Sequence, residues 1–197
     1  MFLNSVFNFL DHLAWRTIAF FSTLTMLFIL QAKGIEIGRR SRFYGLVKTK
    51  RSNAGTIKIG HACTLRSLST SNLIGINRPC ILSALSPESV LTIGNGCGFS
   101  GAVIGCFKSI TIGDNVKCGA NTLITDGDWH PEDSRSGEPR SVVIGNNVWL
   151  GVNVTVLKGV TIGDNSVIGA GSVVVKEIPG NVVAAGNPCK IIKYLKK

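Results

Sequence analysis

The chain has 197 residues, of which 21 are lysine or arginine and 11 are aspartate or glutamate, so its formal net charge is +10. A charge of this sign predicts an anionic partner: a phosphate-bearing cofactor, a membrane surface or nucleic acid. Nucleic acid is the weakest of the three, because the sequence contains no basic helix interleaved with aromatic residues and no zinc-finger spacing.

The first predicted element is a hydrophobic helical segment over residues 1–34, which is rich in Phe and Leu and nearly free of glycine. Its charge-free run, between Arg16 and Lys33, falls just short of the about 20 apolar residues that a membrane span needs. Two interpretations stay open. The segment caps the first coil of a repeat domain, or it lies on a membrane surface. The second interpretation depends on a basic group that could meet anionic lipid: Lys33, Arg39, Arg40, Arg42, Lys48, Lys50 and Arg51.

Residues 35–188 carry a six-residue repeat of aliphatic residues. It is most regular at Ile144, Leu150, Val156, Ile162, Ile168 and Val174. An Ile-Gly pair followed by Asn or Asp occurs at Ile144 and returns at Ile162, three hexapeptides further on. This period predicts an all-β fold, a parallel β-helix with three short strands per turn and internal aliphatic ladders. Residues 189–197 then form a short basic tail, which should cover the last coil.

Cys63, Cys80 and Cys97 recur at a constant interval, and each stands at the fourth position after an aliphatic residue that opens a coil. This spacing places them in an inward position, where a free cysteine behaves as a small buried hydrophobe. No metal is expected, because no Cys-x-x-Cys motif and no histidine at zinc spacing accompany them. Free thiols are typical of the reducing cytoplasm.

One long loop, residues 126–140, interrupts the repeat. The coil openers Ile112 and Ile144 lie much further apart than the three hexapeptides of one regular turn. An insertion of this size falls on a coil corner and is usually functional. The loop holds five of the 11 acidic residues, and these suit hydrogen bonding to a ligand rich in hydroxyl groups: Asp126, Asp128, Glu132, Asp133 and Glu138. Of these, Glu132 and Asp133 are candidates for substrate binding.

The centre of the loop is His130, one of three histidines. A histidine on a polar loop is commonly a plain surface residue. Its place on the large insertion, beside carboxylates, and the lack of another base suited to neutral pH favour a catalytic role. His12 and His61 are weaker candidates, since one lies in the apolar segment and the other at a coil corner.

Five segments carry recognisable motifs: Ile112–Val116, Asp128–Pro131, Ile144–Gly151, Val160–Ser172 and Val183–Pro188. Together they resemble the hexapeptide-repeat acetyltransferases, in particular the galactoside, maltose and nodulation acetyltransferases and the O-acetyltransferases of capsular polysaccharide or exopolysaccharide. The resemblance covers the C-terminal half of the chain closely and the early coils only in pattern.

The resemblance implies a left-handed β-helix, a homotrimer with active sites between neighbouring subunits, and acetyl-CoA as the donor. It implies acetyl transfer to a sugar hydroxyl with His130 as the general base, and Asp128 or Asp126 would orient the imidazole ring. Ser100 stands where the sugar acetyltransferases place a substrate-contacting asparagine, and this departure leaves the identity of the acceptor open.

By the same resemblance, the donor lies in a narrow groove over stacked coils. Gly119, Gly151 and Ala170 match the positions that line pantetheine, and Trp149 borders the thioester end. Three lysines match positions that meet the nucleotide phosphates, although they could alternatively only make a coil edge soluble: Lys176, Lys190 and Lys193.

The main expectation is therefore a sugar O-acetyltransferase of capsular polysaccharide, exopolysaccharide or lipid-linked glycan assembly. Two other functions stay open. One is a serine or amino-sugar acetyltransferase on the same fold. The other is a scaffold subunit without enzymatic activity, which would need neither His130 nor the acidic loop. A metal-dependent hydratase would need three histidines at a subunit interface, which His12, His61 and His130 cannot supply. The enzyme is expected in the cytoplasm, at the inner face of the membrane if residues 1–34 act as an anchor.

Overall fold

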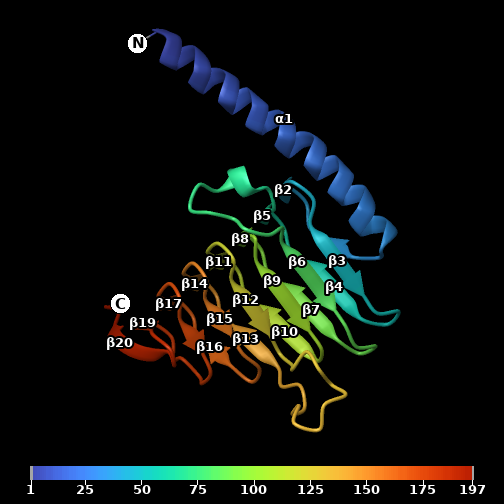
Figure 1. Ribbon diagram of the computed structural model, residues 1–197, viewed down its shortest axis with the longest axis vertical. Coiled ribbons are helices and arrows are strands. Elements are labelled where there is room, and N and C mark those ends of the chain that lie inside the picture. Colours follow the sequence, from blue (N-terminus) through green and yellow to red (C-terminus); the bar gives the residue numbers. More distant parts are fainter. Residues whose placement is uncertain (1, 197) are drawn as a thin grey trace.

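The computed structural model describes the backbone of residues 2–196 and the side chains of residues 12–196. These residues form one long helix, α1 (Phe2–Ala32), a single 3-10 turn, η1 (Ser69–Ser71), and a body of short strands. In Figure 1 the blue helix α1 lies across one end of the body, and a yellow-orange loop projects from the opposite side.

The strands form three sheets, which the chain visits in rotation. The first sheet contains β1 (Glu36–Ile37), β4 (Thr56–Ile59), β7 (Val90–Ile93), β10 (Ser109–Ile112), β13 (Val142–Ile144) and β16 (Thr161–Ile162). The second contains β2 (Arg42–Tyr44), β5 (Thr64–Arg66), β8 (Gly98–Ser100), β11 (Lys117–Cys118), β14 (Trp149–Leu150), β17 (Val167–Ile168), β19 (Val182–Ala185) and β20 (Lys190–Tyr194). The third contains β3 (Lys48–Arg51), β6 (Ile81–Ala84), β9 (Val103–Cys106), β12 (Leu123–Thr125), β15 (Thr155–Val156) and β18 (Val173–Val174).

Along most of the body each strand pairs in parallel with the strand three places further on, so each circuit of the chain stacks on the next. Ile112 of β10 pairs with Ile144 of β13, and Ile144 pairs with Ile162 of β16. The long loop therefore leaves the register of the coils intact. The prediction of a mostly β fold with parallel sheets is confirmed, and the arrangement is the one expected of a hexapeptide-repeat β-helix.

The basic tail ends the body differently from the other coils. Its strand β20 pairs with β19 in antiparallel fashion at the end of the second sheet. The tail therefore adds an edge strand beside β19, and all five residues of β20 remain exposed.

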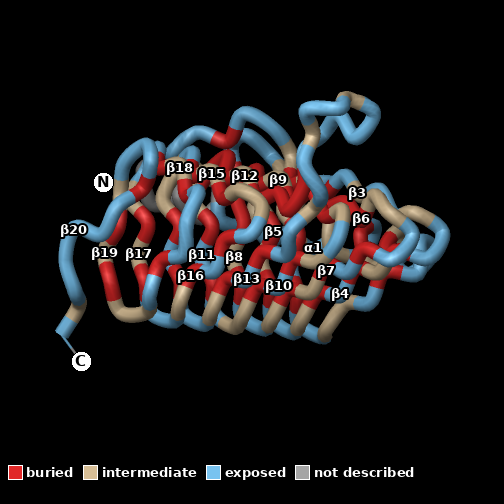
Figure 2. The backbone as a smooth tube through the Cα atoms, turned by 90° about the horizontal axis from the view of Figure 1, so that it is seen from below, coloured by how far each residue is buried: buried red, intermediate tan, exposed pale blue. Residues whose placement is uncertain are grey.

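The core consists of ladders of aliphatic residues along the coils. Ile112, Ile144 and Ile162 are each at most 1% exposed. The second inward position of each unit is also buried: Val148, Val154, Val160, Ser166, Ser172 and Ile178. Figure 2 shows these buried stretches side by side along the body, with exposed residues at many of the corners.

The cysteines occupy the same inward position. Cys63, Cys80 and Cys97 are at most 1% exposed and carry free thiols, which confirms their predicted place in the core. Burial raises the pKa of the Cys80 thiol, so this residue is held as the neutral thiol, which is the unreactive form.

One corner of the body is built from a column of asparagines. Asn147, Asn165 and Asn181 all have a φ between 55° and 58°, a left-handed conformation that asparagine tolerates better than most residues. Their side-chain amides stack through hydrogen bonds, from Asn147 to Asn165 at 3.1 Å and from Asn165 to Asn181 at 3.2 Å. The asparagines thus turn the backbone and join neighbouring coils at once.

The C-terminal half of α1 covers the first coil. Strand β2 is the outermost strand of the second sheet, so the N–H groups on its open edge need partners from elsewhere. The hydroxyl of Thr23 accepts a hydrogen bond from the Phe43 N–H at 3.0 Å, and the hydroxyl of Ser22 accepts one from the Gly45 N–H at 3.1 Å. This part of α1 therefore acts as a cap.

The described part of the helix also exposes large apolar side chains. Met26 and Leu30 are fully buried against the first coil, but Phe20, Phe21 and Phe28 are 59%, 62% and 75% exposed. The 21-residue stretch His12–Ala32 is by length and composition sufficient to cross a membrane, and its most apolar 18-residue window has a mean hydropathy of 1.7 and is 11% buried. The helix thus continues beyond the charge-free run that the sequence suggested.

The cap can be tested by comparing Thr23→Ala with Thr25→Ala, which changes an exposed threonine on the same helix. We expect Thr23→Ala to lower the free energy of unfolding by about 1–2 kcal/mol, because it leaves the Phe43 N–H without a partner. Thr25→Ala should be close to neutral. Urea unfolding followed by circular dichroism measures both, and equal effects would contradict the capping role.

Candidate active site

The loop between β12 and β13 is closed at its base by Asp126. The side chain of Asp126 is fully buried, and its carboxylate accepts hydrogen bonds from the N–H groups of Phe107, Lys108 and Ser109 at 2.6–2.8 Å. Its carbonyl accepts a further hydrogen bond from the Arg140 N–H at 2.8 Å. Asp126 therefore joins both ends of the loop to the preceding coil, and the structure does not bring it to the ring of His130.

Trp129 covers the turn in which the loop begins. Its ring meets that of Phe107 edge to face, with 5.4 Å between the centroids. Gly105 lies beneath it, where a Cβ atom would come within 2.4 Å of the indole. A glycine at this position is needed for the tryptophan to lie flat against the coil.

Asp128 is held by a lysine from the next coil. Its Oδ2 accepts a hydrogen bond from the Lys158 ammonium at 2.6 Å and one from the Gly137 N–H at 2.9 Å. The ammonium also donates to the Gly137 carbonyl at 3.1 Å, so it connects the two arms of the loop. The hydrogen bond from Lys158 lowers the pKa of Asp128. Like Asp126, Asp128 makes these contacts away from the His130 ring.

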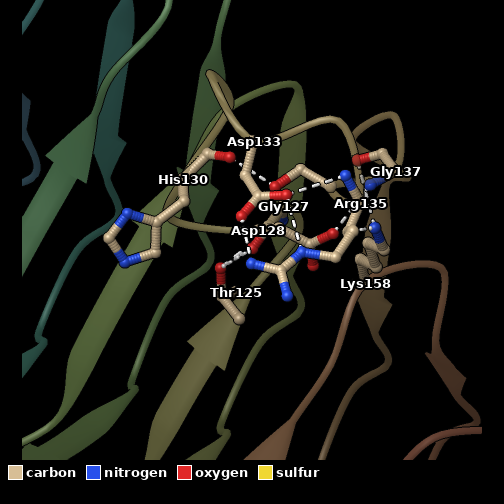
Figure 3. A network of polar contacts seen from close by, with 9 residues as sticks. Thr125, Gly127, Asp128, His130, Asp133, Arg135, Gly137 and Lys158 are labelled. Atoms are coloured by element: carbon tan, nitrogen blue, oxygen red, sulfur yellow. Dashed lines mark hydrogen bonds and ion pairs between the residues drawn. The ribbon is translucent and has the colours of Figure 1, made fainter.

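His130 lies on the outer part of the loop with its side chain 79% exposed. Its Nδ1 is 3.2 Å from Oε1 of Glu132, which is itself 73% exposed. The peptide carbonyl of His130 accepts hydrogen bonds from the Ser136 hydroxyl and the Asp133 N–H. In Figure 3 the imidazole points away from the network around Asp128 and Lys158. The carboxylate in contact with the ring is therefore Glu132, which the sequence suggested as a substrate ligand.

Asp133 has a structural partner of its own. Its two carboxylate oxygens accept hydrogen bonds from Nε and Nη2 of Arg135 at 2.9 and 2.6 Å, and from the Arg135 N–H at 2.9 Å. This pairing lowers the pKa of Asp133. The carboxylate is thus ionised and already occupied within the loop (Figure 3).

Ser100 lies at a different corner of the body. It ends β8 in the second sheet and is 7% exposed, and its hydroxyl accepts a hydrogen bond from the amide of Asn72 at 3.1 Å. The loop 126–140 follows β12 of the third sheet. Within one chain, a complete sheet therefore separates Ser100 from His130.

The small residues expected at the donor site are brought together. Gly119, Gly151 and Ala170 stack in successive coils: a Cβ atom on Gly119 would lie 2.7 Å from the backbone of Gly151, and one on Gly151 would lie 2.6 Å from that of Ala170. Trp149 lies beside this column on β14 and is 55% exposed. The coils approach closely here, and no side chain in the column is larger than a methyl group.

The three lysines expected at the donor phosphates lie at the C-terminal end of the body. Lys176 follows β18, and Lys190 and Lys193 lie on β20, where they pair with Ala185 and Val183. All three are exposed. Lys176 lies on the same circuit of the chain as Ala170, and Lys190 and Lys193 lie beyond it on the last strand.

A small hollow of about 160 Å³ lies at the base of the loop. Asp128, Arg140 and Lys158 form its polar wall, and Leu157 and Val175 belong to its apolar wall. His130 does not line it. His130 and this hollow are therefore separate features of the same loop.

Lys158 is the residue that the sequence analysis missed. Because β12 pairs with β15, with Ile124 opposite Val156, residue 158 stacks beside residue 126. Ile112 and Ile144, on either side of the loop, pair with each other across neighbouring coils. The same number of residues counted forward from Asp126 leads to Lys158, so the spacing of the coil openers would have located this lysine in the sequence.

Comparison with known proteins identifies the repeat. The pattern of the family described as bacterial transferase hexapeptide (six repeats) matches residues 141–176. Galactoside O-acetyltransferase of Escherichia coli (strain K12) is 54% identical over 91 residues, which are 44% of this chain and 45% of that protein. WbbJ of the same strain, named as a lipopolysaccharide biosynthesis O-acetyl transferase, is 45% identical over 103 residues, 46% of this chain and 53% of WbbJ.

A solved structure supports the same relation. Galactoside acetyltransferase in complex with coenzyme A is 31% identical, covers 82% of this chain and is covered over 65% of its own length, with a TM-score of 0.50. The chain spans about half the length of the two curated relatives named above. Residues 141–176 thus match a hexapeptide transferase family, and the homologues of the chain are named acetyltransferases.

The role of Lys158 predicts a change in the titration of Asp128. Lys158→Met should raise the Asp128 pKa toward its ordinary value, because the ammonium that stabilises the carboxylate is gone. Since the folded pKa is the lower one, the ion pair stabilises the loop above the unfolded pKa and is lost as the pH falls through the folded pKa. Carboxyl NMR titration measures the shift. Lys117→Met is the control, and a normal Asp128 pKa in the unchanged protein would contradict the contact.

Proposed function

We propose that the protein is an acetyl-CoA-dependent O-acetyltransferase that acts on a sugar hydroxyl. The observation that carries this proposal is the 54% identity over 91 residues with a galactoside O-acetyltransferase. The coenzyme A complex of galactoside acetyltransferase supports acetyl-CoA as the donor. The exposed histidine on the inserted loop gives this scaffold a base that a purely structural subunit does not need.

In the proposed reaction His130 takes the proton from the acceptor hydroxyl while the hydroxyl oxygen attacks the thioester carbonyl. A carbon–oxygen bond forms, the carbon–sulfur bond breaks, and the departing thiolate receives the proton from the imidazolium. Glu132, 3.2 Å from Nδ1, would fix the tautomer and stabilise the imidazolium. This assigns to Glu132 the orienting role that the sequence suggested for Asp128 or Asp126.

The acceptor and donor would meet at an interface between subunits. His130 is 79% exposed, and Ser100 lies beyond a complete sheet of the same chain. A homotrimer of left-handed β-helices would bring the loop of one subunit against the coils of the next. Ser100 and Asp133 would then contact the acceptor only after local contacts with Asn72 or Arg135 are exchanged.

For the donor we propose the column of Gly119, Gly151 and Ala170 as the pantetheine surface. The absence of long side chains lets a flat ligand lie on the backbone, and Trp149 would border the thioester. The exposed lysines of the last coils would meet the phosphates of the nucleotide: Lys176, Lys190 and Lys193.

We further propose a division of the chain into three parts. Residues 1–34 place the protein at a membrane surface, residues 35–188 form the transferase domain with its loop 126–140, and residues 189–197 close the last coil. Exposed Phe20, Phe21 and Phe28 support the first assignment, since the apolar face of an interfacial helix commonly carries Phe and inserts at the boundary between headgroups and acyl chains. This placement suits the assembly of a surface polysaccharide or lipid-linked glycan at the cytoplasmic face.

The proposal predicts the kinetics of His130→Asn. Thiol release from acetyl-CoA in the presence of sugar acceptors should fall by about 10²–10⁴ in kcat, because the general base is lost. In Glu132→Gln, which removes the negative charge but keeps the size of the side chain, kcat should fall by less, roughly tenfold. Full turnover by His130→Asn, or no acetyl transfer to any sugar by the unchanged protein, would refute the proposed mechanism or activity.

A further inference from the structure

A cleft of about 500 Å³ lies between α1 and β2. It opens where the helix leaves the body: Ser22 and Thr23 are bonded to the strand, and N-terminal to them the helix and strand diverge. Trp15, Ala19 and Phe20 line the helix side of the cleft. The cleft is therefore a wedge with an apolar wall that is continuous with the exposed face of α1.

The cleft also has basic residues, which come from both of its sides. Arg16 and His12 line it from α1 and Arg42 lines it from β2, and neither arginine forms an ion pair with a residue whose side chain is described. The guanidinium of Arg66 stacks on the ring of Tyr44, 4.5 Å from its centroid, directly beside the cleft. Among the residues whose side chains are described, the lining contains no carboxylate. Two arginines thus converge on a space that holds no counter-charge from the described part of the chain.

We propose that this cleft binds the headgroup phosphate of an anionic phospholipid, while the acyl chains lie along the exposed face of α1. Arginine is suited to phosphate through its fork of N–H donors. The phosphate would lie between Arg16 and Arg42, and the lipid chains would contact Phe20 and Leu24.

A lipid fits this site better than a soluble phosphate, because the apolar wall continues outward. Leu24 is 51% exposed, and Phe20 and Phe28 are 59% and 75% exposed on the same helix. Residues 12–66 contain ten lysines and arginines and a single acidic residue, Glu36. Such a surface attracts anionic lipid before the cleft selects its headgroup.

The inference rests on the proposed placement of α1 at a membrane and not on acetyl transfer. Its test uses full-length protein and flotation with two kinds of vesicle, one of phosphatidylcholine alone and one in which a third of the lipid is phosphatidylglycerol. The measured quantity is the preference for the anionic vesicles, expected to be on the order of tenfold or more for the unchanged protein.

Two pairs of variants separate the cleft from diffuse charge. Ala19→Trp fills the cleft without a change of charge, and Ala14→Trp makes the same substitution at an exposed position outside it. Arg16→Gln with Arg42→Gln removes two charges from the cleft. Lys48→Gln with Lys50→Gln removes two charges from the same coil outside it.

We expect the preference to fall to about the level of the neutral vesicles in Ala19→Trp and in the double arginine variant, and to persist in both controls. An unchanged preference in Ala19→Trp, or equal losses in the two charge pairs, would overturn the site. If the unchanged protein binds neither kind of vesicle, for example because a second copy of the chain covers α1, both the site and the membrane placement would be overturned. Acetyl transfer to a soluble sugar is measured in parallel, so failure of the proposed activity is recorded separately.

Discussion

The register between stacked coils is the constraint on which the rest of this structure depends. Each circuit of the chain must return its inward aliphatic residues to the ladder below, as Ile144 does over Ile112 and beneath Ile162. A long insertion is compatible with this constraint only if both of its ends meet the body at one corner. The buried carboxylate of Asp126 fulfils this condition, because it binds three N–H groups of the preceding coil while its carbonyl receives the Arg140 N–H.

The repeat could be predicted from the sequence because the periodicity of a solenoid is a local property. Ile144 to Val174 fall in the core as their spacing indicated, and so do Cys63, Cys80 and Cys97. The position of the loop followed from the same arithmetic. The resemblance to hexapeptide-repeat acetyltransferases is likewise confirmed by the comparisons.

Side-chain partners inside the loop could not be predicted in this way, because they depend on the folding of an irregular segment. Carboxylates of similar appearance separate into different environments: Asp126 is buried, Asp128 is bound to Lys158, Asp133 is bound to Arg135, and Glu132 faces His130. For the N-terminal segment the sequence left two interpretations open, a cap on the first coil and a helix on a membrane surface, and the structure does not require a choice between them. Its C-terminal half caps the first coil, and the apolar side chains left exposed are those on which the membrane proposal rests.

The central claim is that His130 of one subunit acts on a donor bound at the coils of a neighbour. Mixed trimers of two inactive variants, His130→Asn and Ala170→Trp, test it directly. Ala170 is exposed, so the tryptophan should block the donor surface and leave the core intact. The two variants are mixed, unfolded and refolded together. If the site is shared, activity should return at about a quarter of the sites, because that fraction of interfaces pairs an intact histidine with an intact donor surface. Mixed trimers that remain as inactive as either variant alone would contradict a shared site.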